Sequence, residues 1–198
     1  MEKFSHIDNV ATNELQKAVS NGDMRAFKKL FDMYAERLSH FAYSITRNRD
    51  DAVQIMDDVF VKLWKRRYTI NQIENLTTYL YTAVKNTTLN TLSAKAKASI
   101  TESFDNIDIQ LDNNQTPDSL LISSEILSKI HNTVETLPPK CKVIFKLVRE
   151  DGLKYKEVAE ILNISENTVD AQMVIAIRKI SEKVKRHFDF FPKKQKKV

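Results

Sequence analysis

Glycine, proline and cysteine are scarce in this sequence of 198 residues, which has two glycines, four prolines and one cysteine. Ordinary proteins contain about 7% glycine and about 5% proline, and β-sandwiches and doubly wound α/β proteins need these residues in their many tight turns. The scarcity therefore favours an all-α fold. It also excludes a glycine-rich phosphate loop, because Gly22 and Gly152 lie far apart in the sequence. Since 42% of the residues are hydrophobic, the chain has enough apolar side chains to build a core.

Several classes of site are excluded by what else is missing. The single Cys141 allows neither a disulfide framework nor a zinc site with several cysteines. The four histidines (His6, His40, His131 and His187) are too scattered to pair as metal ligands. No apolar run approaches the roughly 20 residues of a membrane span, and the first residues lack the pattern of a signal peptide. We therefore expect a cytoplasmic protein with no cofactor, no metal and no insertion into a membrane.

Charge is distributed in blocks along the chain. Residues 1–97 carry 15 basic and 11 acidic side chains, residues 98–128 carry six acidic and no basic ones, and residues 129–198 carry 16 basic and nine acidic ones. The acidic stretch lacks helical periodicity and contains Pro117, so it indicates a linker. We expect two small helical domains, at 1–97 and 119–187, joined by a flexible acidic linker at 98–118 and followed by a basic tail at 188–198. The linker is either a solvated spacer or a mimic of a polyanion that the basic faces bind.

Three amphipathic patterns in the first half predict helices. The first starts after Asp23, a plausible N-terminal cap, and the second starts near Asp50 and Asp51, whose carboxylates suit the positive end of a helix dipole. The third runs from about Ile73 to Lys97 and has a polar face rich in hydroxyl, aromatic and amide groups, which suit unpaired bases and phosphates. This face comprises Thr77, Thr78, Tyr79, Tyr81, Thr82, Lys85, Asn86, Thr87, Thr88 and Asn90.

The second half contains a helix-turn-helix pattern. After an expected helix at about 119–136 and another at 141–148, residues 155–162 predict a short helix that turns Val158, Ala159, Ile161 and Leu162 inward. Asn163 follows at the turn, where a left-handed backbone is needed and asparagine tolerates it well. Ser165 is placed to cap a second helix, in which apolar residues recur at helical spacing. These are Val169, Met173, Ala176, Ile177 and Ile180.

In such a unit, the first turns of the second helix enter the major groove of DNA. The side chains placed there are Ser165, Glu166, Asn167, Thr168, Asp170, Ala171 and Val174. Asn167 can bond to adenine, while Ala171 or Val174 can touch the methyl group of thymine. The cations that follow suit phosphates; they are Arg178, Lys179, Lys183, Lys185 and Arg186.

Three segments carry a resemblance to a known family: DDAVQIMDDVFVKLWKRR, NLTTYLYTAVKNTTLN and LPPKCKVIFKLVREDGLKYKEVAEILNISENTVDAQMVIAIRKI. They resemble, in the same order, the region 2 helix, the helix that follows it, and region 4 of bacterial sigma factors of the extracytoplasmic-function (ECF) group. The resemblance covers about residues 20–97 and 119–187. It implies two helical domains on a flexible linker, acting as a dissociable specificity subunit of RNA polymerase rather than as an enzyme.

The resemblance also implies which residues act. Contact with core RNA polymerase falls on Asp51, Gln54, Asp57, Asp58, Phe60, Lys62, Leu63 and Trp64. Melting and reading of the minus-ten promoter element fall on the loop at 68–75 and on the helix after it. The loop supplies Tyr68, Asn71 and Asn75, and the helix supplies Tyr79, Lys85 and Asn86. Reading of the minus-thirty-five element falls on Ser165, Glu166, Asn167, Thr168, Asp170, Ala171, Val174, Arg178 and Lys179. Many such factors are held inactive by an anti-sigma factor, so the expected partners are core polymerase, promoter DNA and an anti-sigma protein.

The sequence departs from the family pattern in three places. Val53 and Gln54 stand where an acidic pair is common, and Lys142 stands near a usual arginine. The recognition helix lacks the usual cations between Ala171 and Arg178, so we expect low affinity for an isolated duplex. The alternative hypothesis is a two-domain helix-turn-helix regulator that binds duplex DNA without polymerase, which leaves the acidic helix at 50–67 unexplained. An enzyme is disfavoured, because the sequence offers no cluster of metal ligands and no positioned histidine.

Overall fold

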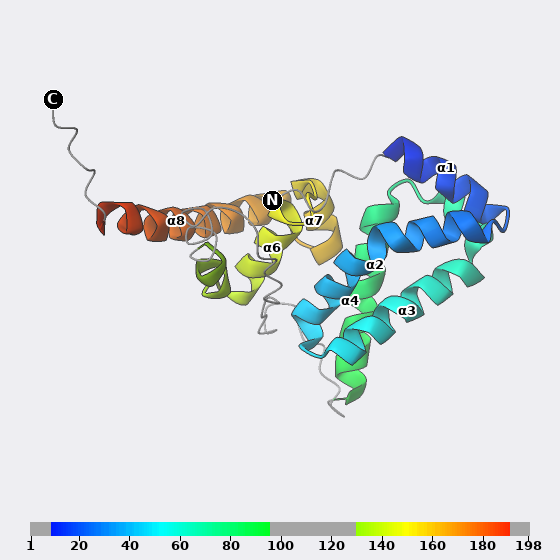
Figure 1. Cartoon of the computed structure of the whole chain (residues 1–198), viewed down its shortest axis with the longest axis horizontal. Helices are drawn as coiled ribbons and strands as arrows, with labels where there is room; N and C mark the ends of the chain where they lie inside the picture. The colour runs from blue at the N-terminus through cyan, green and yellow to red at the C-terminus, as the bar shows by residue number, and fades with distance from the viewer. Residues whose placement is uncertain (1–8, 96–129, 191–198) are drawn as a thin grey trace.

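The computed structural model describes residues 9–95 and 130–190, with side chains described from Thr12 to Lys95 and from Ile130 to Lys185. Within these ranges the chain is helical and has no strand, which confirms the all-α prediction. The first half contains α1 (Asn9–Ser20), α2 (Met24–Thr46), α3 (Arg49–Lys65), the 3-10 helix η1 (Arg67–Gln72) and α4 (Leu76–Lys95). The second half contains a short helical stretch at 130–135, then α6 (Pro139–Arg149), α7 (Tyr155–Leu162) and α8 (Glu166–Phe190) (Figure 1). The expected linker at 98–118 lies outside the described residues, as does most of the basic tail.

Side-chain caps set the ends of α2 and α3. Asp23 Oδ1 accepts hydrogen bonds from the backbone amides of Arg25 and Ala26, at 2.8 and 3.2 Å, which confirms the predicted cap. Asn48 caps α3 in the same way by accepting from the amide of Asp51 at 3.1 Å. Between the two helices Arg47 takes a left-handed conformation with φ of 56°, so the chain reverses within a few residues and α3 packs back along α2.

The predicted apolar stripes form most of the core of the first half. Leu38 and Phe41 of α2, Ile55 and Val59 of α3, and Leu80 of α4 are fully or almost fully buried. The sequence predicts that the polar face of α4 is open to solvent, but three of its side chains are not. Thr78, Tyr81 and Thr88 are buried.

The second half folds as the predicted helix-turn-helix. The inward-facing residues of α7 are all buried, and Asn163 adopts the expected left-handed conformation with φ of 55°. Val169, Met173 and Ala176 of α8 are buried against α6 and α7. Ile177 was expected in the same row but is 42% exposed, whereas Ala176 beside it is buried and Ile180 packs on the same cluster, so Ile177 lies outside the buried face of α8.

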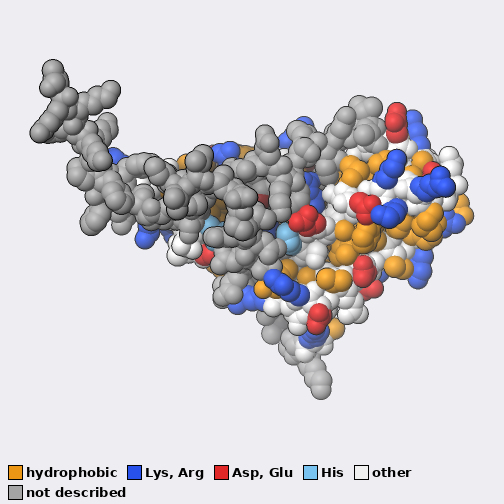
Figure 2. All heavy atoms as spheres, in the orientation of Figure 1, with side chains coloured by type: hydrophobic (Ala, Val, Ile, Leu, Met, Phe, Trp, Pro, Cys, Tyr) orange, Lys and Arg blue, Asp and Glu red, His pale blue; other side chains and the backbone are white. Residues whose placement is uncertain are grey.

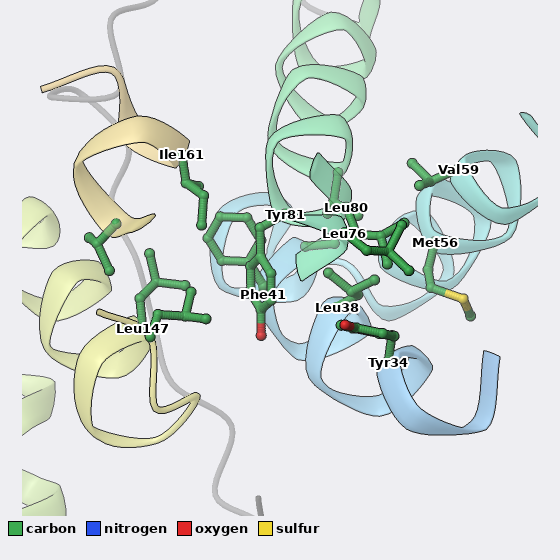
Figure 3. Packing of buried hydrophobic residues seen from close by; sticks show 14 of the residues in the cluster. Tyr34, Leu38, Phe41, Met56, Val59, Leu76, Leu80, Tyr81, Leu147 and Ile161 are labelled. Carbon is green, nitrogen blue, oxygen red and sulfur yellow. The ribbon is translucent and has the colours of Figure 1, made fainter. Parts of the chain in front are cut away.

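The two halves are in contact through α4 and α7. Figure 3 shows Tyr81 and Phe41 of the first half lying beside Ile161 and Leu147 of the second, and their buried side chains form one continuous cluster. Packing against these residues of the second half explains why Tyr81 does not face solvent. In the first turns of α8, Val169 and Met173 belong to this cluster, whereas Glu166, Asn167, Asp170 and Ala171 stay exposed.

Candidate nucleic-acid interface

The first turns of α8 form the candidate recognition surface. Ser165 caps the helix, since its Oγ accepts from the amide of Thr168 at 3.1 Å. The side chains predicted to enter the major groove are exposed, apart from Thr168, which is half-buried and whose Oγ1 lies 2.8 Å from Ser165 Oγ. Val174 is 57% exposed, although it is a large apolar residue. The structure thus brings together on one open helix face Ser165, Glu166, Asn167, Asp170, Ala171 and Val174.

The support for this surface lies directly behind it. Cys141 of α6 is fully buried, and its Sγ donates to the backbone carbonyl of Gln172 at 3.2 Å. Burial raises the pKa of the Cys141 thiol, so the thiol stays protonated and serves packing rather than chemistry. Further along α8, Arg178 is exposed and Lys179 is half-buried, on the part of the helix that follows the recognition turns.

The outer face of α3 is the second candidate surface. Gln54, Asp57, Asp58 and Lys62 are exposed on it, as predicted for contact with polymerase. Two large apolar side chains lie among them, Val53 at 47% and Val61 at 51% exposure. Figure 2 shows hydrophobic side chains gathered between acidic and basic ones over the first half of the molecule. This face therefore combines two exposed valines, separated by Asp57, with acidic and basic side chains.

Not every predicted contact residue of α3 faces outward. Phe60 and Leu63 are only 2% and 3% exposed and belong to the core. Trp64 is half-buried and packs on Phe27 of α2 with ring centroids 4.9 Å apart. Asp51 is half-buried and pairs with Lys95 of α4 at 2.6 Å. Sequence reasoning missed the outward position of Val53 and Val61, although their spacing with Asp57 on one helix face was a signal for it.

The predicted minus-ten residues fall into two groups. Tyr68 and Asn71 of η1, with Tyr79 and Asn86 of α4, are exposed. Asn75 is instead half-buried: its Oδ1 accepts from the amide of Thr78 at 3.0 Å, and its Nδ2 donates to Glu157 Oε1 of α7 at 2.8 Å.

A cleft of about 400 Å³ lies between α3 and α4, beside this exposed group. Its lining residues are Val59, Lys62, Arg66, Tyr79, Ala83, Asn86 and Thr87. Apolar walls with an aromatic ring, an amide and two cations at the edge provide groups that stack on a base and bind a phosphate. Lys85 is half-buried next to Asn86, and burial lowers the pKa of its ammonium group. Sequence reasoning did not place Lys62 and Arg66 beside Tyr79, because that proximity depends on how α3 packs on α4.

Among the described residues, no three histidine, cysteine or carboxylate side chains gather as a metal site would require. In the same parts of the chain, no helix is both long and apolar enough to cross a bilayer.

Comparison with known proteins gives matches in both halves. The family model for sigma-70 region 2 matches residues 30–98, and that for sigma-70, region 4 matches residues 127–180. The ECF RNA polymerase sigma-E factor of Haemophilus influenzae is 26% identical over 179 residues, which cover 86% of this chain and 93% of that protein. The protein with the same name in Escherichia coli K12 is 25% identical over 177 residues, covering 86% and 92%.

The fold is also shared with a solved structure, that of CnrH in complex with the cytosolic domain of CnrY. The TM-score is 0.55 with 18% identity, over 87% of this chain and 96% of the matched one. The two family models match in the order region 2 and then region 4, and the similarity to each sigma-E factor extends over most of both chains. These findings agree with the helix-turn-helix of the second half and with the exposed face of α3 in the first. The chain belongs to the sigma-70 family, as a sigma factor of the extracytoplasmic-function group.

Proposed function

We propose that this sigma factor directs promoter-specific initiation through three separate surfaces. The outer face of α3 binds core RNA polymerase, the exposed part of η1 and α4 melts and reads the minus-ten element, and the first turns of α8 read the minus-thirty-five element. The protein forms no covalent bond with a substrate in this role and is not an enzyme. The observation that carries the proposal is the occurrence of both sigma-70 regions in one chain, at residues 30–98 and 127–180.

The exposed valines and acids on the outer face of α3 support the assignment to polymerase. Val53, Asp57 and Val61 recur every four residues, so they lie along one side of the helix. Burying two such valines against a partner is favourable by the hydrophobic effect, and the acids beside them give the contact its charge complementarity. Phe60 and Leu63, which are buried, act on this surface by holding α3 in place and do not touch polymerase themselves.

The open face of α8 supports readout of double-stranded DNA. Asn167 is exposed in the first turn of the helix, where a carboxamide can bond to both N6 and N7 of adenine. Glu166 and Asp170 flank it and would be repelled by phosphates. Affinity for an isolated duplex is therefore low, and stable binding depends on polymerase.

Three partners complete the proposal. Core polymerase and promoter DNA place the site of action in the cytoplasm. A third partner is an anti-sigma protein that covers the polymerase-binding and DNA-reading surfaces. The fold that this chain shares with CnrH, which was solved in complex with the cytosolic domain of CnrY, supports the expectation of such a protein partner.

The test is reconstitution with sigma-free core polymerase. The full chain is added to the core enzyme, and run-off transcripts are measured on genomic fragments. We expect transcripts with defined start sites, and loss of both transcription and core binding in Asp57→Lys with Asp58→Lys. The matched control is Asp32→Lys, which reverses an exposed acid of α2 that pairs with Lys28 at 2.7 Å. Tight duplex binding with no association with polymerase would contradict the proposal and support the regulator alternative.

A further inference from the structure

A stack of planar side chains leads from Phe27, at the edge of the core of the first half, to Tyr68 at the start of η1. The ring of Phe27 in α2 contacts that of Trp64 at the end of α3, with centroids 4.9 Å apart. The guanidinium of Arg67 lies 4.8 Å from the centroid of Trp64 and 4.4 Å from that of Tyr68. Arg67 thus contacts two aromatic rings, one half-buried and packed on Phe27 and one exposed.

Hydrogen bonds fix the guanidinium in this position. Arg67 Nη1 donates to the backbone carbonyl of Trp64 at 3.2 Å, and Nη2 donates to the hydroxyl of Tyr68 at 2.6 Å. Among the described residues no carboxylate pairs with Arg67, so the positive charge is not neutralised within this part of the protein. Only a planar, forked cation can stack on two rings and donate to both acceptors, and lysine has neither property.

The stack determines what Tyr68 can do. Tyr68 is 66% exposed, and an exposed tyrosine on a short 3-10 turn would otherwise exchange between rotamers. The guanidinium covers part of the Tyr68 ring, and the rest of the ring is open to solvent. An aromatic ring held in place beside an unneutralised cation is suited to stack on an unpaired base while the cation attracts the strand's phosphates.

We propose that Arg67 is a positioning residue for promoter opening: it holds Tyr68 in the orientation that stacks on an unpaired base, and it links this orientation to Trp64 at the end of the polymerase-binding helix. This inference rests on the proposed function, because it takes an unpaired promoter strand as the ligand. Arg67 does not itself read the base. It restricts the ring of Tyr68 before the strand arrives, so that less entropy is lost on binding.

The test is a double-mutant cycle on holoenzyme, with fluorescence anisotropy as the readout. The probe is a duplex that carries a premelted bubble at the minus-ten element of a promoter that the wild-type holoenzyme transcribes. We expect Arg67→Lys and Tyr68→Ala each to weaken binding of the bubble about tenfold, within the range of one lost base stack. The double variant should be no weaker than Tyr68→Ala alone, because Arg67 acts through Tyr68. A full additional loss in the double variant would overturn the positioning role and show that Arg67 acts by its own charge.

Two controls separate positioning from folding and from polymerase binding. Arg49→Lys makes the same chemical change at the opposite end of α3, where Arg49 lies 6.0 Å from the ring centroid of Tyr43, and should leave binding of the bubble unchanged. Affinity for core polymerase should be the same in wild type and Arg67→Lys. Loss of core binding in Arg67→Lys would contradict the proposal.

A second readout needs no DNA. Trp64 is the only tryptophan, so its fluorescence reports the stack in the free protein. We expect the emission of Trp64 to change in Arg67→Lys and to stay the same in Arg49→Lys. Unchanged emission in Arg67→Lys would show that the stack does not form. A wild-type holoenzyme that binds no bubble DNA would contradict the proposed function itself. Normal wild-type binding that Arg67→Lys does not alter would contradict only the role of Arg67.

Discussion

Asn75 and Glu157 join the N-termini of two helices from opposite halves of the chain. Asn75 Oδ1 caps α4 by accepting from the amide of Thr78 at 3.0 Å, while Glu157 Oε2 caps α7 by accepting from the amide of Lys154 at 2.8 Å. Asn75 Nδ2 donates to Glu157 Oε1 at 2.8 Å, so the two caps are bonded to each other across 82 residues of sequence. A residue predicted to read DNA is thus engaged between the halves in this arrangement.

Removing either member of this pair should lower stability by more than the loss of its own cap. Asn75→Ala removes a cap, which costs about 1 kcal/mol, together with a hydrogen bond to a charged group, which contributes about 1.5–3 kcal/mol. We expect Asn75→Ala and Glu157→Ala to show positive coupling in a double-mutant cycle, measured by urea unfolding. Asn71→Ala, at an exposed site in η1, is the control and should unfold like wild type. Strictly additive losses would show that the pair does not interact in solution.

Asp151 should make the stability depend on pH. It follows α6 and is buried, and burial raises its pKa from 3.8 to about 7, although Lys146, Tyr81 and Arg37 act in the opposite direction. The nearby Glu150 raises the pKa further. The folded protein therefore holds this proton more tightly than the unfolded chain does. The stabilisation is fully present below pH 3.8 and is lost as the pH rises towards about 7, at about 1.4 kcal/mol per unit of pKa difference.

Replacing Asp151 tests this dependence directly. Asp151→Asn keeps the shape of the side chain and cannot ionise, so we expect it to be more stable than wild type above pH 7 and to lack the decline below that pH. The measurement is urea unfolding at a series of pH values. Glu150→Gln, at an exposed neighbour, should keep the decline. If wild type instead gained stability relative to Asp151→Asn as the pH rises, the ionised carboxylate would be the stabilised form at this position.

The helix-turn-helix could be predicted from the sequence in register, because its determinants are local. The cap at Ser165 and the left-handed Asn163 each act within a few residues of their own position. The burial of Tyr81 could not be predicted in this way. It depends on α7 packing against α4, a contact between distant segments that leaves no periodic mark on α4 itself. For the same reason, the raised pKa of Asp151 has no counterpart in the local sequence.

Neighbouring residues of α3 should separate packing from binding. Leu63→Ala removes a buried side chain and should lower the free energy of unfolding by about 2–5 kcal/mol. Val61→Ala removes an exposed one, so it should change stability by less than about 0.5 kcal/mol and yet weaken binding to core polymerase. Stability is measured by urea unfolding and affinity by titration of labelled core enzyme. If Val61→Ala bound polymerase like wild type, the outer face of α3 would not be the contact surface.

Asn167 should set the preference at one base pair of the upstream promoter element. Its side chain is exposed in the first turn of α8, and Asn167→Ala leaves the cap of Ser165 and the buried row of Val169 and Met173 unchanged. The variant should relax discrimination at that base pair by about 1–3 kcal/mol, because the bonds to the base edge are lost while the contacts to phosphates stay. The measurement is holoenzyme transcription from promoters that carry each of the four base pairs at every upstream position. Arg178→Ala is the contrasting variant: it removes an exposed cation suited to a phosphate, so it should weaken all promoters alike. A uniform loss in Asn167→Ala as well would mean that Asn167 supports the helix and does not read a base.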